Sequence, residues 1–455
     1  MYRLIQAFRG NRLLARLLRS SSLLLAGYGA SQVLRLASNL ILTRILFPEA
    51  FGLMALVSVI TIGLTMFSDV GIGSSISQNK RGDDPDFLNT AWTAQVIRGL
   101  MLWGIACLLA WPFAQFYNEP VLALYLPVAG ISLVLSGLNP TRIETAHRHL
   151  LVGRVTMLEL ISQVIGITFM VILTWLTGSV LALVLGGVVQ SAVKLVLTHL
   201  FLPGMRNSFR WEKAAAQELV HYGKWVMMST AFWFVSVQGD RAILGKYLSL
   251  DALGLYNIGY FLASAPIMLG FAVTHRVLIP VYRDKPAGAS AENKTKLNHL
   301  RMAISSAVIG MLLLMSFIGP ELVDFLYDTR YQLSGVMVTL IACSMIPVAI
   351  GMTYDQAAMA TGDSRSQFIY SAIRAILLVI FVVWGVSQLG LVGAIIGSAS
   401  AMVLAHPVLI WLALKHHVWD PKHDIGFALI SLIFGGAAIW LHWDAVVLMV
   451  AQTGP

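Results

Sequence analysis

The chain has 455 residues, of which 57% are hydrophobic and only 12% are charged, and its mean hydropathy is +0.76. Soluble domains carry about twice that charged fraction, so the composition indicates a polytopic membrane protein with little room for a soluble catalytic domain. The formal charge of +9 does not indicate nucleic-acid binding, because the basic residues are scattered between apolar segments. Cys107 and Cys343 lie within apolar runs, so neither a disulfide framework nor a metal site is expected.

The N-terminal segment, residues 1–20, interleaves arginines with leucines, which is typical of an amphipathic helix on the cytoplasmic membrane surface. Twelve hydrophobic spans follow, and a thirteenth lies within the C-terminal segment, residues 416–455. They are too long for barrel strands, so all are predicted to be helices. The spans are 22–46, 50–77, 89–111, 119–138, 152–175, 180–202, 220–248, 252–279, 298–319, 335–358, 366–388, 391–414 and 425–443.

The distribution of Lys and Arg between these spans predicts the orientation of the chain. Most basic residues outside the spans fall in alternate connections, whereas the opposite connections contain only Arg44, Lys246 and Arg330. Basic residues concentrate on the cytoplasmic side of membrane proteins, so the N-terminus is expected in the cytoplasm.

An internal repeat predicts two lobes. The sequence Glu49–Leu53, between the first two spans, recurs as Asp251–Leu255, between the seventh and eighth spans. Six spans separate the copies, so both halves have the same orientation and a pseudo-two-fold axis along the membrane normal. The sequence therefore predicts an N-lobe at 21–203, a cytoplasmic connection at 204–219 and a C-lobe at 220–415.

Two motifs resemble a known family. The segment from Leu46 to Gly52 and the Asp69–Gly73 sequence are similar to the N-terminal signature of polysaccharide transporters in the MOP superfamily, most of all to exporters of O-antigen and colanic acid. The resemblance implies an all-α membrane protein with two six-helix lobes around a central cavity. It also implies alternating access and export of undecaprenyl-pyrophosphate-linked oligosaccharides to the periplasmic leaflet of the bacterial inner membrane. Polysaccharide polymerase and chain-length machinery are the implied partners.

Polar residues inside the spans are the candidate substrate-binding residues, because charges at the centre of a membrane helix usually face protein or water. In the first span, Gln32, Arg35 and Asn39 recur at three or four residues and form a polar stripe with Tyr28, Ser31 and Ser38. In the seventh span, Asp240 and Arg241 occupy the positions that the repeat assigns to Ser38 and Asn39. Further basic candidates are Arg98, Lys194 and Arg374.

We expect these basic residues to line a cationic cavity, since guanidinium groups donate paired hydrogen bonds to a pyrophosphate and remain charged. For Arg98 and Lys194, pairing inside the bundle or snorkelling to the interface is an equal alternative. Glu159 and Asp240 are candidates for coupling to a proton or sodium gradient. Asp69 and Asp355 lie near span ends, where structural roles are expected.

Other functions stay open at this point. A lipid II-type flippase or a multidrug antiporter of the same superfamily would share the architecture, although basic intramembrane residues favour an anionic substrate. A membrane polysaccharide polymerase or ligase would need longer non-membrane segments for its chemistry. No catalytic residue, metal or bound cofactor is therefore expected, and the chain is not predicted to be an enzyme.

Overall fold

The computed structural model describes residues 13–68, 71–149, 151–284 and 287–453, and over these ranges it contains helices and no strands. The described helices before α10 are α2 (Leu13–Ile45), α3 (Pro48–Phe67), α4 (Ile72–Gln78), α5 (Pro85–Tyr117), α6 (Leu122–Gly137), α7 (Arg142–Arg148), α8 (Val152–Thr177) and α9 (Leu181–Phe201). They are followed by α10 (Lys213–Tyr247), α11 (Leu250–Ala263), α12 (Ala265–Asp284), η1 (Ala287–Ala289), α13 (Ala291–Leu326), η2 (Thr329–Tyr331), α14 (Leu333–Gly351), α15 (Asp355–Thr361), α16 (Ser364–Lys415), α17 (Pro421–Leu441) and α18 (Trp443–Thr453). The chain is thus an all-α polytopic membrane protein, as the sequence predicts.

The helices that could cross a membrane correspond to hydrophobic spans of the sequence. Within the described residues, nine helices are long and apolar enough to cross a membrane, or ten if α6 and α7, bent by 58°, form one broken span. Two long helices, α2 and α10, are less apolar because they contain the polar residues predicted for the binding site. Most of the expected amphipathic segment, residues 1–20, lies outside the described residues.

The structure divides into two compact units, which are described separately. The first contains the chain up to Leu46 and Val57–Ala231, and the second contains Phe47–Leu56 and the chain from Phe232 onward. The division therefore falls inside α3 and inside α10, whereas the sequence places the connection between lobes at 204–219. The first half of α3 and the second half of α10 both belong to the second unit.

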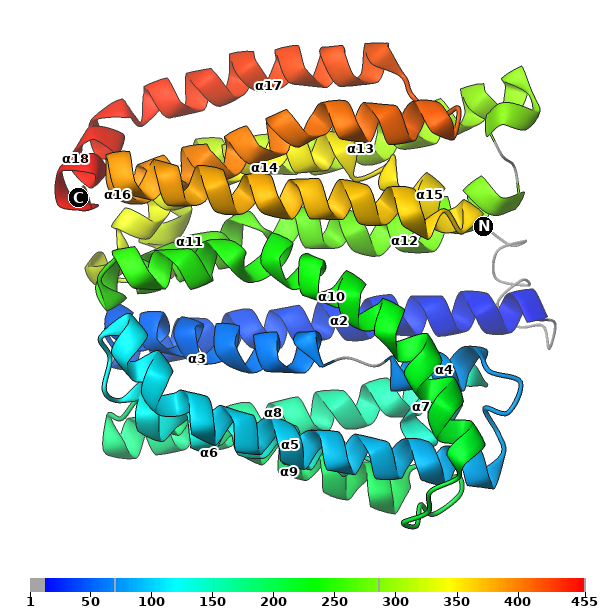
Figure 1. Cartoon of the computed structure of the whole chain (residues 1–455). Coiled ribbons are helices and arrows are strands. Elements are labelled where there is room, and N and C mark those ends of the chain that lie inside the picture. The colour runs from blue at the N-terminus through cyan, green and yellow to red at the C-terminus, as the bar shows by residue number, and fades with distance from the viewer. Residues whose placement is uncertain (1–12, 69–70, 150, 285–286, 454–455) are drawn as a thin grey trace. The chain divides into compact units, whose positions relative to one another are not determined.

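In the first unit, α5, α6, α8 and α9 lie side by side, and α2 packs on α8 (Figure 1). The chain that leads into α10 is fixed to α5 of the same unit. The backbone N–H groups of Ser208 and Glu212 donate to the side chains of Asn89 and Thr90 at 2.9 and 3.0 Å. The expected cytoplasmic connection, 204–219, is consequently a non-helical segment attached to this unit up to Glu212, and from Lys213 onward it is the start of α10.

In the second unit, α13 packs against α14 and α17, and α16 contains two of the expected spans. The backbone of α16 leaves helical geometry at Leu389 and at Gly390, which has a positive φ of 57°. A Cβ at Gly385 would lie 2.0 Å from the carbonyl oxygen of Gly393, so the segments before and after this break are in direct backbone contact. The break coincides with the boundary predicted between 366–388 and 391–414.

The two copies of the internal repeat meet within the second unit. A Cβ at Gly52 would lie 2.0 Å from the carbonyl oxygen of Leu250, and a Cβ at Gly254 would lie 1.9 Å from that of Pro48. Equivalent positions of the two copies therefore make reciprocal contacts. The starts of α3 and α11 cross so closely that only glycine fits at these two positions.

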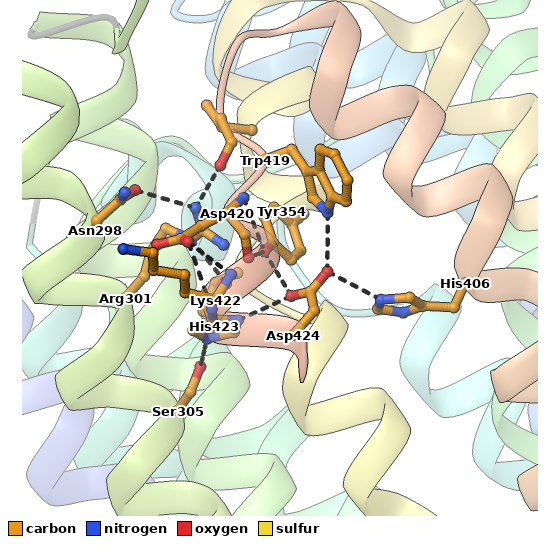
Figure 2. A network of polar contacts seen from close by, with 12 residues as sticks. Asn298, Arg301, Ser305, Tyr354, His406, Trp419, Asp420, Lys422, His423 and Asp424 are labelled. Atoms are coloured by element: carbon orange, nitrogen blue, oxygen red, sulfur yellow. Dashed lines mark hydrogen bonds and ion pairs between the residues drawn. The ribbon is translucent and has the colours of Figure 1, made fainter. Parts of the chain in front are cut away.

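A buried polar network attaches the start of α17 to the second unit (Figure 2). The Asp424 carboxylate accepts hydrogen bonds from the Tyr354 hydroxyl at 2.6 Å and from Trp419 Nε1 at 3.1 Å, and its two oxygens also contact His406 Nε2 and His423 Nδ1. The fully buried guanidinium of Arg301 stacks 3.8 Å from the centre of the Tyr354 ring. The C-terminal span is thus an integral part of this unit.

Candidate functional site

A cluster of charged and aromatic side chains lies where α10 meets α11 in the second unit. Tyr256 donates its hydroxyl hydrogen to Asp240 Oδ2 at 2.6 Å, and Asp240 is only 8% exposed. The Arg241 guanidinium donates to Gln238 Oε1 at 2.8 Å and lies 4.1 Å from the centre of the Tyr260 ring. Asp240 and Arg241, which are neighbours on α10, therefore provide an acid and a base, and each contacts a different tyrosine of α11.

The first turns of α16 bring a second base to the same cluster. Arg374 lies one turn after Tyr370 on α16, and its charge acts on the carboxylate of Asp355, at the start of α15. Tyr260 lies within electrostatic range of both Arg241 and Arg374. The C-lobe cluster, defined here as Asp240, Arg241, Tyr256, Tyr260, Asp355, Gln356, Gln367, Tyr370 and Arg374, thus contains two acids and two arginines.

Several buried polar atoms of this cluster have no hydrogen-bond partner among the described residues. Each such atom costs about 1–3 kcal/mol when it makes no hydrogen bond, so several of them in one place form a candidate ligand-binding site. Both donors and acceptors are involved. They are Arg241 Nε, Arg374 Nε, Asp240 Oδ1, Gln356 Oε1 and Gln367 Oε1.

The polar stripe of α2 lies in the first unit. Ser31 donates its hydroxyl to Gln163 Oε1 at 2.7 Å, and Gln163 Nε2 donates back to the Ser31 carbonyl at 3.1 Å. Gln32 Nε2 donates to the Tyr28 hydroxyl, and its buried Oε1 has no partner in the described part of the chain. Arg35 is exposed and Asn39 is half-buried. One edge of the stripe therefore packs on α8, whereas Arg35 is exposed.

Two of the basic candidates are bound to neighbouring helices of the first unit. Lys194 Nζ forms an ion pair with Glu159 Oε1 at 2.6 Å, which joins a predicted substrate-binding base to a predicted coupling acid. Arg98 Nε donates to Ser68 Oγ at 3.1 Å, and its Nη2 donates to the Thr65 carbonyl at 2.7 Å. These contacts match the structural alternative that the sequence left open for both residues.

The sequence does not identify Gln356 or Tyr260 as candidate site residues, and for Asp355 it predicts a structural role at the end of a helix. The structure does place Asp355 at a helix start, but the same carboxylate also faces the charge of Arg374. A glutamine or tyrosine within a hydrophobic span carries no special signal, and only its neighbours in space identify it. Asp69 lies outside the described residues.

The sequence of the chain is similar to those of known polysaccharide biosynthesis proteins. A family of polysaccharide biosynthesis proteins matches residues 41–336. The amylovoran biosynthesis protein AmsL of Erwinia amylovora is 22% identical over 331 residues, which cover 71% of this chain and 84% of AmsL. The lipopolysaccharide biosynthesis protein WzxC of Escherichia coli K12 is 21% identical over 378 residues, which cover 82% of this chain and 75% of WzxC.

Solved structures share the fold. The lipid II flippase MurJ in an inward closed conformation has a TM-score of 0.70 at 13% identity, with 93% of this chain and 95% of MurJ covered. An inward-facing MATE multidrug transporter of the MOP superfamily has a TM-score of 0.66 at 14% identity, with 85% of this chain and 94% of the transporter covered. These similarities confirm the MOP-type fold. The family match extends over more than half of the sequence, so the chain belongs to the polysaccharide biosynthesis protein family.

Proposed function

We propose that the protein is a flippase for polyprenyl-pyrophosphate-linked oligosaccharides, the precursors of a surface polysaccharide such as O-antigen, exopolysaccharide or capsule. Family membership and the relatives named for lipopolysaccharide and amylovoran biosynthesis support this class of substrate. The observation that carries the proposal is the pair of arginines in the C-lobe cluster, Arg241 and Arg374, whose buried Nε atoms lack partners among the described residues. Guanidinium donors in a poorly hydrated site suit an anionic pyrophosphate.

In this proposal the chain lies in the bacterial inner membrane with a cytoplasmic N-terminus. The pyrophosphate and sugars pass from the cytoplasmic to the periplasmic leaflet by alternating access, while the polyprenyl tail stays in lipid. The substrate is not altered covalently. Downstream polymerase and chain-length machinery would receive the exported units.

We assign energy coupling to Asp240 in preference to Glu159. The Glu159 carboxylate is already neutralised by Lys194, whereas Asp240 Oδ1 is buried and lacks a partner in the described structure. A carboxylate of this kind can take up a proton or a sodium ion as its access to water alternates. Asp240→Asn should remove the dependence of transport in vesicles on an imposed proton or sodium gradient. If transport by the variant depends on the gradient as strongly as transport by the wild-type protein, a different residue couples transport to the gradient.

Depletion of the protein in its native host tests the transport function. We expect a lipid-linked oligosaccharide to accumulate in the cytoplasmic leaflet and surface polysaccharide to disappear, with both effects reversed by the wild-type gene. Arg35→Ala should fail to restore export although it inserts normally, because it removes the exposed charge of the α2 stripe. Depletion without accumulation of any lipid-linked sugar would rule out the proposed function.

A further inference from the structure

We infer that Gln356 and Gln367 form a sugar-binding subsite beside Arg374, which recognises the sugar attached directly to the pyrophosphate. The inference rests on the proposed function and adds a specificity determinant to it. It is carried by two amide oxygens of the C-lobe cluster that are buried and unpartnered in the described structure. Both residues belong to the second unit, on the adjacent helices α15 and α16.

The orientation of the Gln356 amide is fixed by its neighbour. Gln356 Nε2 donates to Asp355 Oδ1 at 3.0 Å, so the amide oxygen points away from this contact as a free acceptor. The side chain is only 1% exposed, and water in the open solvent does not compensate for the missing hydrogen bond. A buried acceptor held in this way lowers the stability of the folded protein unless a ligand supplies a hydrogen-bond donor.

Gln367 lies on the same face of α16 as the arginine. Residues at i, i+3 and i+7 share one face of a helix, so Gln367, Tyr370 and Arg374 are aligned. The helix α15, which begins at Asp355, packs against α16. The two amide acceptors therefore lie on packed helices together with a guanidinium whose Nε is itself unpartnered within the described residues.

The chemistry of these atoms defines the ligand. An ionised pyrophosphate accepts hydrogen bonds and has no hydrogen to donate, so it cannot satisfy the amide oxygens, which require a donor. Sugar hydroxyl and acetamido N–H groups are donors, and the first sugar of a lipid-linked oligosaccharide is joined directly to the pyrophosphate. A guanidinium flanked by acceptors fits this junction.

Binding of defined lipids to the full-length protein in nanodiscs tests the subsite. The probes are undecaprenyl pyrophosphate alone and the same lipid carrying one glucose, one galactose or one N-acetylglucosamine. The variants are Gln356→Met and Gln367→Met, which keep side-chain length and remove the amide group, including the acceptor oxygen. Gln388→Met is the matched control, since Gln388 is an exposed glutamine on the same helix.

For the wild-type protein we expect at least one sugar-bearing lipid to bind more tightly than undecaprenyl pyrophosphate alone. Each Gln→Met variant in the subsite should lower the preference for that sugar-bearing lipid over the bare lipid about threefold to tenfold, which corresponds to the loss of one hydrogen bond. The melting temperature of each variant checks that it is folded. The Gln388→Met control should bind all four lipids normally.

Two results would overturn the subsite. Wild-type protein that binds none of the three sugar-bearing lipids more tightly than the bare lipid has no sugar recognition of this kind. Variants of Gln356 and Gln367 that retain the full preference for sugar would place recognition elsewhere. Failure of wild-type protein to bind the bare pyrophosphate lipid is a separate outcome, which would contradict the proposed function itself.

Discussion

At the residue scale, the structure separates the predicted basic residues into three groups. Arg98 and Lys194 have partners on neighbouring helices, and Arg35 is exposed. Arg241 and Arg374 are half-buried, with unpartnered Nε atoms in the described structure. A guanidinium N–H group without a hydrogen-bond partner can still donate to an acceptor. We therefore place pyrophosphate binding in the second unit.

The ion pair between Lys194 and Glu159 can be tested by reversing its charges. Lys194→Glu alone or Glu159→Lys alone places two like charges about 3 Å apart, which is strongly unfavourable between membrane helices. We expect each single variant to lower export and protein level, and the double variant to restore most of both. A double variant that inserts well but does not export would instead show that Lys194 has a direct role in binding.

The sequence predicts which residues are polar within spans, but it does not predict their partners. Lys194 and Glu159 are both visible as intramembrane charges, yet their pairing depends on how α8 and α9 are rotated against each other. The same limit explains why Gln356 was missed, because its free oxygen is recognised only once Asp355 is seen to hold the other end of the amide.

At the element scale, the reciprocal glycine contact explains why the repeat retains Gly52 and Gly254. A methyl group at either position would lie about 2 Å from a backbone carbonyl oxygen, which cannot move independently of its helix. Gly52→Ala and Gly254→Ala should each destabilise the detergent-purified protein by about 1–3 kcal/mol, the usual cost of overpacking. Gly29→Ala in α2 is the control, since among the described residues no atom outside the local backbone of α2 lies within 4 Å of the added methyl group. Equal melting temperatures for all three variants would contradict the close crossing.

The start of α16 provides a pH-dependent contact outside the membrane spans. Lys415 Nζ lies 2.6 Å from Asp363 Oδ2, and this contact holds the pKa of Asp363 below its usual value. A lowered pKa means that the carboxylate stabilises the folded state above its unfolded pKa of about 3.9, and that this contribution disappears as the pH falls toward the folded pKa.

We therefore expect the melting temperature of the wild-type protein in detergent to fall between about pH 5 and pH 3 more steeply than that of Asp363→Asn. Asparagine keeps the capping acceptor for the Ser366 N–H and removes only the charge. Parallel curves of melting temperature against pH for the two proteins would show that the ion pair does not contribute to stability.

At the scale of the whole molecule, the hydrophobic spans and the internal repeat predict the fold correctly. The order of the helices, the break near Gly390 and the correspondence between Gly52 and Gly254 can all be read from apolar length and repeated motif. The division between the units cannot, because it falls inside α3 and α10. Hydropathy records that a helix is long enough to span a membrane, but not which unit each half of it packs against.

The central claim is that the two arginines of the C-lobe cluster bind the pyrophosphate, and the affinity of the reconstituted protein for undecaprenyl pyrophosphate tests it most directly. Charge-assisted hydrogen bonds contribute about 1.5–3 kcal/mol each, so Arg241→Gln and Arg374→Gln together should weaken binding by a factor of roughly 100 or more. Lys422→Gln, which removes an exposed charge from the start of α17, should leave the affinity unchanged. An arginine double variant that binds undecaprenyl pyrophosphate as tightly as the wild-type protein would contradict the claim.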